Sequence, residues 1–127
     1  MNNPIEVLDT CSKISLTFSH RRKRIRLTKG LLKELNYPRF VMLLINQATL
    51  QVAIQPCSES EKDAFTITEE SLNNKNGFEL SSMILVGKIY EMMEWSFDTT
   101  YKCVKYVKYN NLLIFNLKLS SELVIVE

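Results

Sequence analysis

The chain has 127 residues, of which 46% are hydrophobic and 24% are charged, and its formal net charge is +2. This composition is typical of one globular domain, and the three Gly and three Pro residues argue against long flexible linkers. The longest apolar run, residues 40–45, is too short to cross a bilayer, and the first residues lack the apolar stretch of a signal peptide. We therefore expect a cytoplasmic protein that makes no membrane contact.

The first elements along the chain predict a strand pair. Residues 14–19 alternate between apolar and polar side chains, which is typical of a half-buried strand. Ile25 and Leu27 resume the alternation after a basic stretch. We therefore expect a turn over residues 20–23 and a second strand in which Arg24 and Arg26 face solvent.

A short helix and a hairpin are predicted next. Thr28 is a suitable N-cap for a helix over residues 29–36, and Pro38 ends it because the residue before a proline is pushed out of helical conformation. Residues 39–46 and 50–56 then predict two strands around a turn. The first of these is apolar on both faces, which predicts a central strand covered on both sides.

The polar residues 57–77 predict a connector, in which residues 64–68 could add a short strand. A similar order of elements then returns. We expect a strand over residues 77–81, a helix over 82–95 with Leu85, Ile89, Met92 and Met93 on its apolar stripe, two further strands, and a C-terminal strand over 120–127.

The two halves match residue by residue once gaps are allowed. Phe78 and Leu80 match Ile25 and Leu27 at a sequence offset of 53 residues. The ends of the two predicted helices match at an offset of 58, and the strands after them match at an offset of 63. This pattern predicts an internal repeat with two five-residue insertions in the second copy. The expected fold is a β-rich α+β domain. Its halves, residues 1–56 and 78–127, are joined by the connector 57–77 and form a pseudo-symmetric, barrel-like core.

One short segment makes the net charge of the protein positive. Six cations and no acid lie between His20 and Lys29, whereas the remaining ten cations face fourteen acids. Such an imbalance predicts a localised anion-binding surface. The candidate nucleic-acid-binding residues are Arg21, Arg22, Lys23, Arg24, Arg26 and Lys29.

Residues 23–56 resemble the swapped-hairpin module of AbrB-like transcription factors. The pattern is carried by Arg24, Ile25, Leu27, Lys29, Leu31, Leu32 and Leu35. Two such units in one chain resemble the MraZ branch of that family, in which tandem copies form one pseudo-dimeric barrel. The resemblance implies a DNA-binding transcription regulator whose first-hairpin arginines and lysines contact DNA. The chain departs from the family pattern at Lys23, where glycine is usual, and at Thr28, where proline is usual.

Several other interpretations of the basic segment remain open. It could be a solvated edge that prevents aggregation, or it could pair with the protein's own acids, such as Glu59, Glu61 and Asp63. RNA or protein partners are further alternatives. Tyr101, Tyr106 and Tyr109 alternate with lysines in a way that superficially suits single-strand binding, but strict strand alternation gives neither face a continuous aromatic platform.

Catalysis and metal binding have little support in the sequence. His20 is the only histidine and lies in the basic segment, and Cys11, Cys57 and Cys103 are widely spaced, as expected for buried, reduced thiols. We expect no enzyme activity, no cofactor and no metal.

The leading function is therefore DNA binding through the basic hairpin, by a protein that forms homo-dimers or larger assemblies because both halves offer edge strands. The alternative is a non-catalytic interaction or assembly module, such as an accessory protein of a phage or mobile element.

Overall fold

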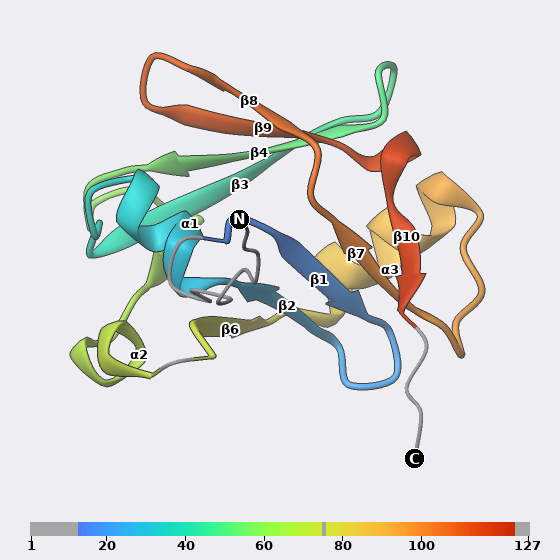
Figure 1. The fold of residues 1–127 in the computed structure, drawn as a ribbon, viewed down its shortest axis with the longest axis horizontal. Coiled ribbons are helices and arrows are strands. Elements are labelled where there is room, and N and C mark those ends of the chain that lie inside the picture. The colour runs from blue at the N-terminus through green and yellow to red at the C-terminus, as the bar shows by residue number, and fades with distance from the viewer. Residues whose placement is uncertain (1–12, 75, 124–127) are drawn as a thin grey trace, which may run out of the picture.

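The computed structural model describes residues 13–74 and 76–123 and shows a strand-rich α+β fold (Figure 1). Two five-stranded antiparallel sheets account for all ten strands of this part of the chain. Sheet A contains, in spatial order, β10 (Ser121–Leu123), β7 (Thr100–Cys103), β1 (Leu16–Ser19), β2 (Arg24–Leu27) and β6 (Phe78–Ser81). Sheet B contains β5 (Phe65–Thr66), β3 (Phe40–Asn46), β4 (Gln51–Pro56), β9 (Leu112–Asn116) and β8 (Tyr106–Tyr109). The α+β prediction is confirmed.

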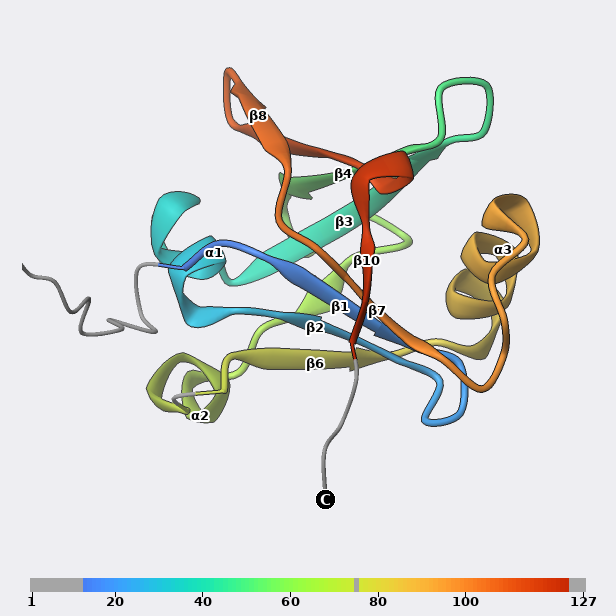
Figure 2. The same cartoon turned by 45° about the vertical axis from the view of Figure 1, so that its right-hand side comes forward.

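The inner faces of the two sheets meet in one hydrophobic core. Alternation along each strand produces it: Ile25 and Leu27 of β2 are fully buried, as are Val52 and Ile54 of β4. The two sheets do not join into a closed barrel within the described residues. The core therefore lies between two stacked sheets whose outer faces point in opposite directions (Figure 2).

Three helices connect and flank the sheets. They are α1 (Lys29–Glu34), α2 (Glu69–Asn73) and α3 (Met83–Met93), with a 3-10 turn at Leu117–Leu119. In Figures 1 and 2, α1 lies at one end of the sheets and α3 at the other. Thr28 and Ser82 cap the two longer helices, because each hydroxyl accepts a hydrogen bond from the backbone N–H three residues later.

The structure corrects three details of the sequence-based elements. The connector 57–77 contains a helix, α2, as well as the short strand β5. The stretch that carries Tyr101 to Tyr109 is two strands, because the chain leaves sheet A after Cys103 and enters sheet B at Tyr106. The apolar strand β3 is central, but only one of its faces is covered: Leu44 is 43% exposed. The residues predicted for the C-terminal strand beyond Leu123 lie outside the described residues.

Candidate nucleic-acid interface

The basic segment folds as predicted, into β1, a turn at residues 20–23, and β2. Ile25 and Leu27 are buried in the core, so the alternation turns Arg24 and Arg26 to the outer face of sheet A. Their side chains are 44% and 37% exposed. Arg22, in the turn, joins them on the same side and is 57% exposed.

A carboxylate from the second half of the chain lies among these arginines. Strand β6 pairs with β2 so that Glu79 stands directly opposite Arg26. Arg26 donates two hydrogen bonds to Glu79 Oε2, at 3.1 Å from Nε and 2.7 Å from Nη2. Arg24 donates to Glu79 Oε1 at 3.0 Å, and an Arg22 nitrogen lies 3.8 Å from the same oxygen. One carboxylate therefore holds three guanidinium groups in a row.

The charge of this row is only partly neutralised. The hydrogen bond from Arg26 is the main reason why the pKa of Glu79 is lowered; partial burial opposes the effect, and the hydrogen bond from Arg24 adds to it. Glu79 is therefore an anion at neutral pH, and three arginines exceed it by two positive charges. Each guanidinium has five N–H donors, so several donors remain available to phosphate oxygens.

The rest of the outer face of sheet A adds one cation, Lys102, and several hydroxyl groups. Residues directly opposite each other on antiparallel strands project to the same side. One row across all five strands is Ser121, Lys102, Thr17, Arg26 and Glu79. We call this outer face, with Arg22, Arg24, Arg26, Lys102 and Glu79, the arginine face.

Two polar hollows lie on either side of the arginine row. One, of about 250 Å³, is lined by Thr17, Ser19 and Thr100 beside the arginines. The other, of about 450 Å³, is lined by Ser71, Asn74 and Asn76 from the chain around α2. Hydroxyl and amide groups beside guanidinium groups are the donors that commonly contact nucleic-acid phosphates.

The structure separates the remaining predicted residues from this row. Arg21 is 77% exposed and lies 3.7 Å from Asp98, which is itself 88% exposed, so this ion pair contributes little stability. Lys23 occupies the left-handed position of the turn, with φ of 56°, and is exposed. Lys29 begins α1 beyond the opposite end of β2 and lines neither hollow.

The acids that pair with the arginines are not those considered from the sequence. Glu59, Glu61 and Asp63 were the candidates, but the ion pairs of these arginines within the described residues go to Glu79 and Asp98. The sequence reasoning missed Glu79 and Lys102. The repeat contained a signal for Glu79, because an offset of 53 matches it with Arg26, its partner in the sheet.

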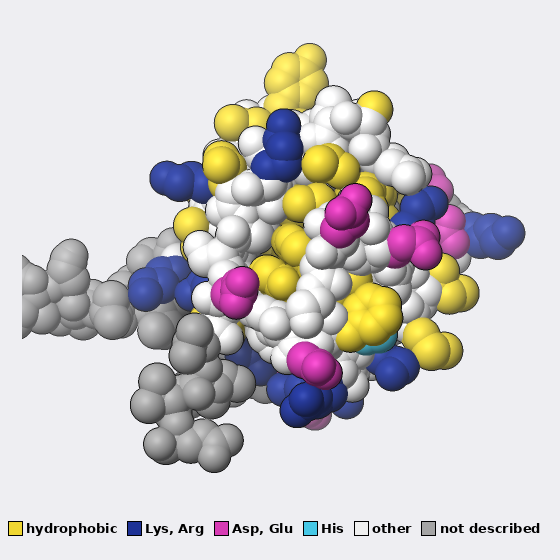
Figure 3. Space-filling view, turned by 90° about the vertical axis from the view of Figure 1, so that its right-hand side faces the viewer, with side chains coloured by type: hydrophobic (Ala, Val, Ile, Leu, Met, Phe, Trp, Pro, Cys, Tyr) yellow, Lys and Arg dark blue, Asp and Glu magenta, His cyan; other side chains and the backbone are white. Residues whose placement is uncertain are grey.

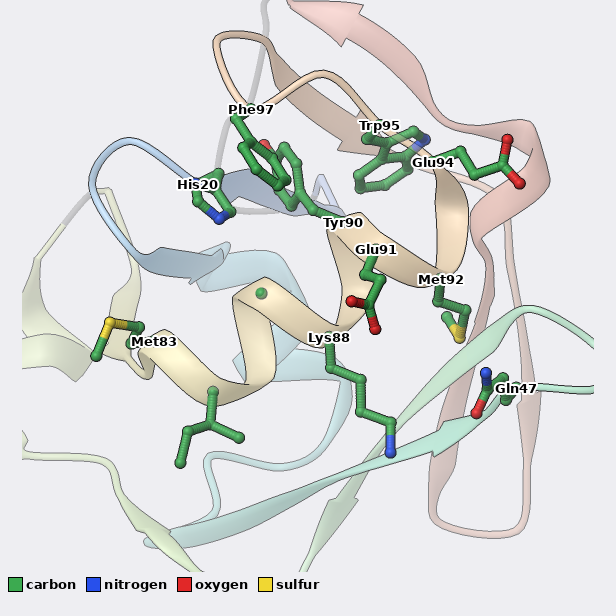
Figure 4. Close-up of a pocket in the computed structure, with 12 residues that line it drawn as sticks. His20, Gln47, Met83, Lys88, Tyr90, Glu91, Met92, Glu94, Trp95 and Phe97 are labelled. Atoms are coloured by element: carbon green, nitrogen blue, oxygen red, sulfur yellow. The ribbon is translucent and has the colours of Figure 1, made fainter.

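A larger cavity lies beside α3 and has different chemistry from the two polar hollows (Figure 4). It has a volume of about 1000 Å³ and is lined by residues that include His20, Lys88, Tyr90, Glu91 and Phe97. In Figure 3, hydrophobic side chains reach the surface on this side of the molecule, with acidic side chains among them. A phosphate backbone is poorly matched to such a mixture.

The aromatic side chains at this cavity hold the fold together. His20 stacks on Phe97 with ring centroids 4.1 Å apart. The hydroxyl of Tyr90 lies 2.9 Å from the carbonyl oxygen of Phe18 and 2.7 Å from that of Thr99, and it donates its proton to these acceptors. Burial raises the pKa of Tyr90 to about 12, so this phenol stays protonated at neutral pH.

The tyrosines that alternate with lysines do not form one surface. Tyr101 is buried and stacks on Trp95 at 4.1 Å, whereas Tyr106 packs on Phe115 in the other sheet at 5.6 Å. Tyr109 is 64% exposed. The three rings belong to two sheets and cannot stack successive bases.

Three further features bear on the sequence-based expectations. In residues 13–74 and 76–123, no helix is long and apolar enough to span a membrane. The same residues contain no group of three or more His, Cys, Asp or Glu side chains placed to hold a metal ion. Cys103 is buried, which raises its pKa, and Cys57 is partly buried; Cys11 lies outside the described part of the chain.

Comparison of the chain with protein-family models, with curated proteins and with solved structures finds no match.

Proposed function

We propose that this protein is a DNA-binding regulator that binds the phosphates of duplex DNA through its arginine face. The observation that carries the proposal is the row of Arg22, Arg24 and Arg26 around one carboxylate. This row gathers half of the six cations of the basic segment on one solvent-facing surface, with a net positive charge and unused guanidinium donors. Phosphate contacts of this kind supply most non-specific affinity for nucleic acid, because each contact releases bound counterions.

In this proposal, the arginine face and the turn at residues 20–23 contact different parts of the DNA. Arg24 and Arg26 are fixed by hydrogen bonds to Glu79, so their positions are set before a ligand arrives and little side-chain entropy is lost on binding. They suit phosphates, which fix the register of a protein on the duplex. Arg21 and Lys23, at the exposed turn between β1 and β2, are the residues that would reach base edges in the major groove.

The resemblance to AbrB-like and MraZ-like proteins enters as part of the same proposal. We propose that the two halves are related by an approximate two-fold axis. Two sheet pairings support it: the offset of 53 matches Arg26 with Glu79, and the offset of 63 matches Val52 with Phe115. Each of these matched pairs stands directly opposite in an antiparallel pairing, as residues beside a two-fold axis do.

The lengths and the ends of helices α1 and α3 agree with the same two-fold relation between the halves. Helix α1 has 6 residues and α3 has 11, a difference that equals the first five-residue insertion of the repeat. Both helices end in the same way. The N–H of Tyr37 donates to the carbonyl of Leu32 at 2.7 Å, and at the offset of 58 the N–H of Trp95 donates to the carbonyl of Tyr90 at 2.9 Å.

The test is the salt dependence of duplex binding. We expect wild-type affinity to fall steeply as salt rises, and the double variant Arg22→Ala/Arg24→Ala to lower the magnitude of the log–log slope by about 1.8, since each lost phosphate contact is worth about 0.9. Binding to one duplex is measured by fluorescence anisotropy over a series of salt concentrations.

The matched control removes the same charge elsewhere. Lys62 and Lys88 are exposed and lie away from the arginine face, so Lys62→Ala/Lys88→Ala should keep the wild-type slope. If duplex DNA does not bind at low salt, the proposed function is wrong. If both double variants change the slope equally, net charge alone drives binding and the arginine face is not the site.

A non-catalytic assembly module is the second candidate. The observation that favours it is the exposed apolar surface on the outer face of sheet B, where Leu44 is 43% and Val107 is 61% exposed. An assembly module without nucleic-acid affinity would fail the salt titration yet still associate through such a surface.

A further inference from the structure

The outer face of sheet B is an apolar surface without charged side chains. Strand register assigns the side chains: those opposite the buried Val52, Ile54, Leu113 and Phe115 point inward, and their sequence neighbours point outward. The outward set is Phe40, Met42, Leu44, Asn46, Gln51, Ala53, Gln55, Thr66, Val107, Tyr109, Leu112, Ile114 and Asn116. Eight of these thirteen described residues are apolar, and none of the thirteen is charged. We call this surface the apolar face.

A continuous apolar stripe crosses the middle of this face. Leu44 stands opposite Ala53, Ala53 opposite Ile114, and Ile114 opposite Val107, so one row of aliphatic side chains runs over four strands. A hollow of about 410 Å³ lies over Leu44, Ala53 and Ile114. None of the outward residues is buried, so no described segment of the chain covers the stripe.

The extent of the apolar face fits that of a specific protein interface. Five strands spaced about 4.8 Å apart, with about five residues of roughly 3.4 Å each, give a projected area on the order of 400 Å². The accessible surface of protruding side chains is larger than its projection, so two such faces in contact bury on the order of 1,000 Å², near the lower limit for a specific interface.

The lack of charge points to one kind of partner. In a chain with 24% charged residues, an uncharged sheet face is complementary to another copy of itself, because self-contact brings no like charges together and buries apolar surface on both sides. We propose that two copies of this protein pack the apolar face of one against the apolar face of the other, as stacked sheets do. The arginine faces then lie on opposite outer surfaces of the dimer.

The exposed apolar side chains of α3 make a weaker candidate for the same role. Ile84 is 82% and Met83 is 64% exposed, but Lys88 and Glu91 lie in the same cavity wall. Contact between two copies there would remove these charges from water, which costs free energy. This difference makes Ile84 the matched control for a substitution on the apolar face.

The test is the effect of a lysine on self-association. Sedimentation velocity over a concentration series should show a monomer–dimer equilibrium for wild type. The Leu44→Lys variant should dimerise at least about tenfold more weakly, since it buries a charge on both sides of the interface. Leu44 is already 43% exposed, so the variant should keep its fold, which urea unfolding checks. Ile84→Lys should dimerise like wild type.

Three other results would overturn the proposal. A wild-type chain that stays monomeric at all concentrations contradicts it, as does dissociation by Ile84→Lys with Leu44→Lys unaffected. Val107→Lys tests the alternative that two copies pair along the edge of sheet B. Val107 lies both on the apolar face and on the edge strand β8. If Val107→Lys dissociates the dimer and Leu44→Lys does not, the copies pair along the edge of β8 and the face-to-face contact is wrong.

Discussion

The geometry of the arginine face depends on one residue, Glu79, and on its carboxylate. Its side chain is 25% exposed and accepts hydrogen bonds from Arg24 and Arg26, with Arg22 close by. Without this anion, the guanidinium groups of the turn and of β2 would lie side by side on one surface and repel. Glu79 also lies where a phosphate would bind in the proposed function, so it both orders the arginines and reduces their attraction for an anion.

Replacing Glu79 by Gln should therefore change stability and DNA binding in opposite directions. We expect Glu79→Gln to lower the free energy of unfolding by roughly 1–2 kcal/mol at neutral pH, because charged hydrogen bonds are lost, while duplex affinity rises. The pKa of Glu79 is lowered in the folded protein. Its stabilisation is therefore complete above the ordinary carboxyl pKa of about 4.3 and is lost as pH falls through the lowered value. The difference between wild type and variant should vanish in strong acid, which urea unfolding at several pH values measures.

Glu59→Gln supplies the control, because Glu59 is an exposed acid of the connector and the substitution changes net charge equally. It should leave both stability and the pH profile close to wild type. Equal stability of wild type and Glu79→Gln at neutral pH would contradict the role assigned to the carboxylate.

At the scale of elements, the close approach of β6 to β2 depends on a glycine. Gly77 precedes β6 with φ of +82°, and a Cβ added there would lie 2.1 Å from the carbonyl oxygen of Leu27. Only glycine fits, since the neighbour is backbone and cannot move aside. Gly87, in the middle of α3, has nothing within 4 Å of such a Cβ.

The two glycines should respond to alanine with opposite signs. Gly77→Ala should lower the free energy of unfolding by at least about 1–3 kcal/mol, since it adds both strain and a clash with backbone. Gly87→Ala should raise it by about 0.5–1 kcal/mol, because alanine favours helix and no clash opposes it. Urea unfolding of both variants checks the pair. A stabilising Gly77→Ala would mean that β6 does not lie against the end of β2 as described.

The elements that local patterns determine could be predicted from the sequence. The strand pair, the turn before Arg24 and the cap at Thr28 all follow from alternation and capping within a few residues. Contacts between distant segments could not be predicted in this way. Glu79 reaches Arg26 because β6 pairs with β2 across 53 residues, and no local pattern encodes that pairing.

The prediction for β3 was wrong for a physical reason. A run that is apolar on both faces normally indicates a strand covered on both sides. Here the outer side chains of β3, among them Leu44, face solvent within the single chain. A second copy on the apolar face would cover them, so this discrepancy agrees with the proposed dimer.

At the scale of the whole molecule, two opposite surfaces differ in chemistry. The arginine face carries guanidinium groups and hydroxyls on sheet A, and the apolar face carries aliphatic and aromatic side chains on sheet B. One hydrophobic core lies between them, so we expect that substitutions on one surface leave the other unchanged. Variants of the two faces should therefore have independent effects on DNA binding and on self-association.

The most direct measurement is a map of the duplex-binding surface at residue resolution. Amide signals of isotope-labelled protein are followed by NMR while duplex DNA is added at low salt. The arginine face predicts shifts in the turn at residues 20–23, in β2 and in β6, with β3 and β4 unchanged. An unchanged spectrum, or shifts confined to α3 or to the apolar face, would contradict duplex binding by the arginine face.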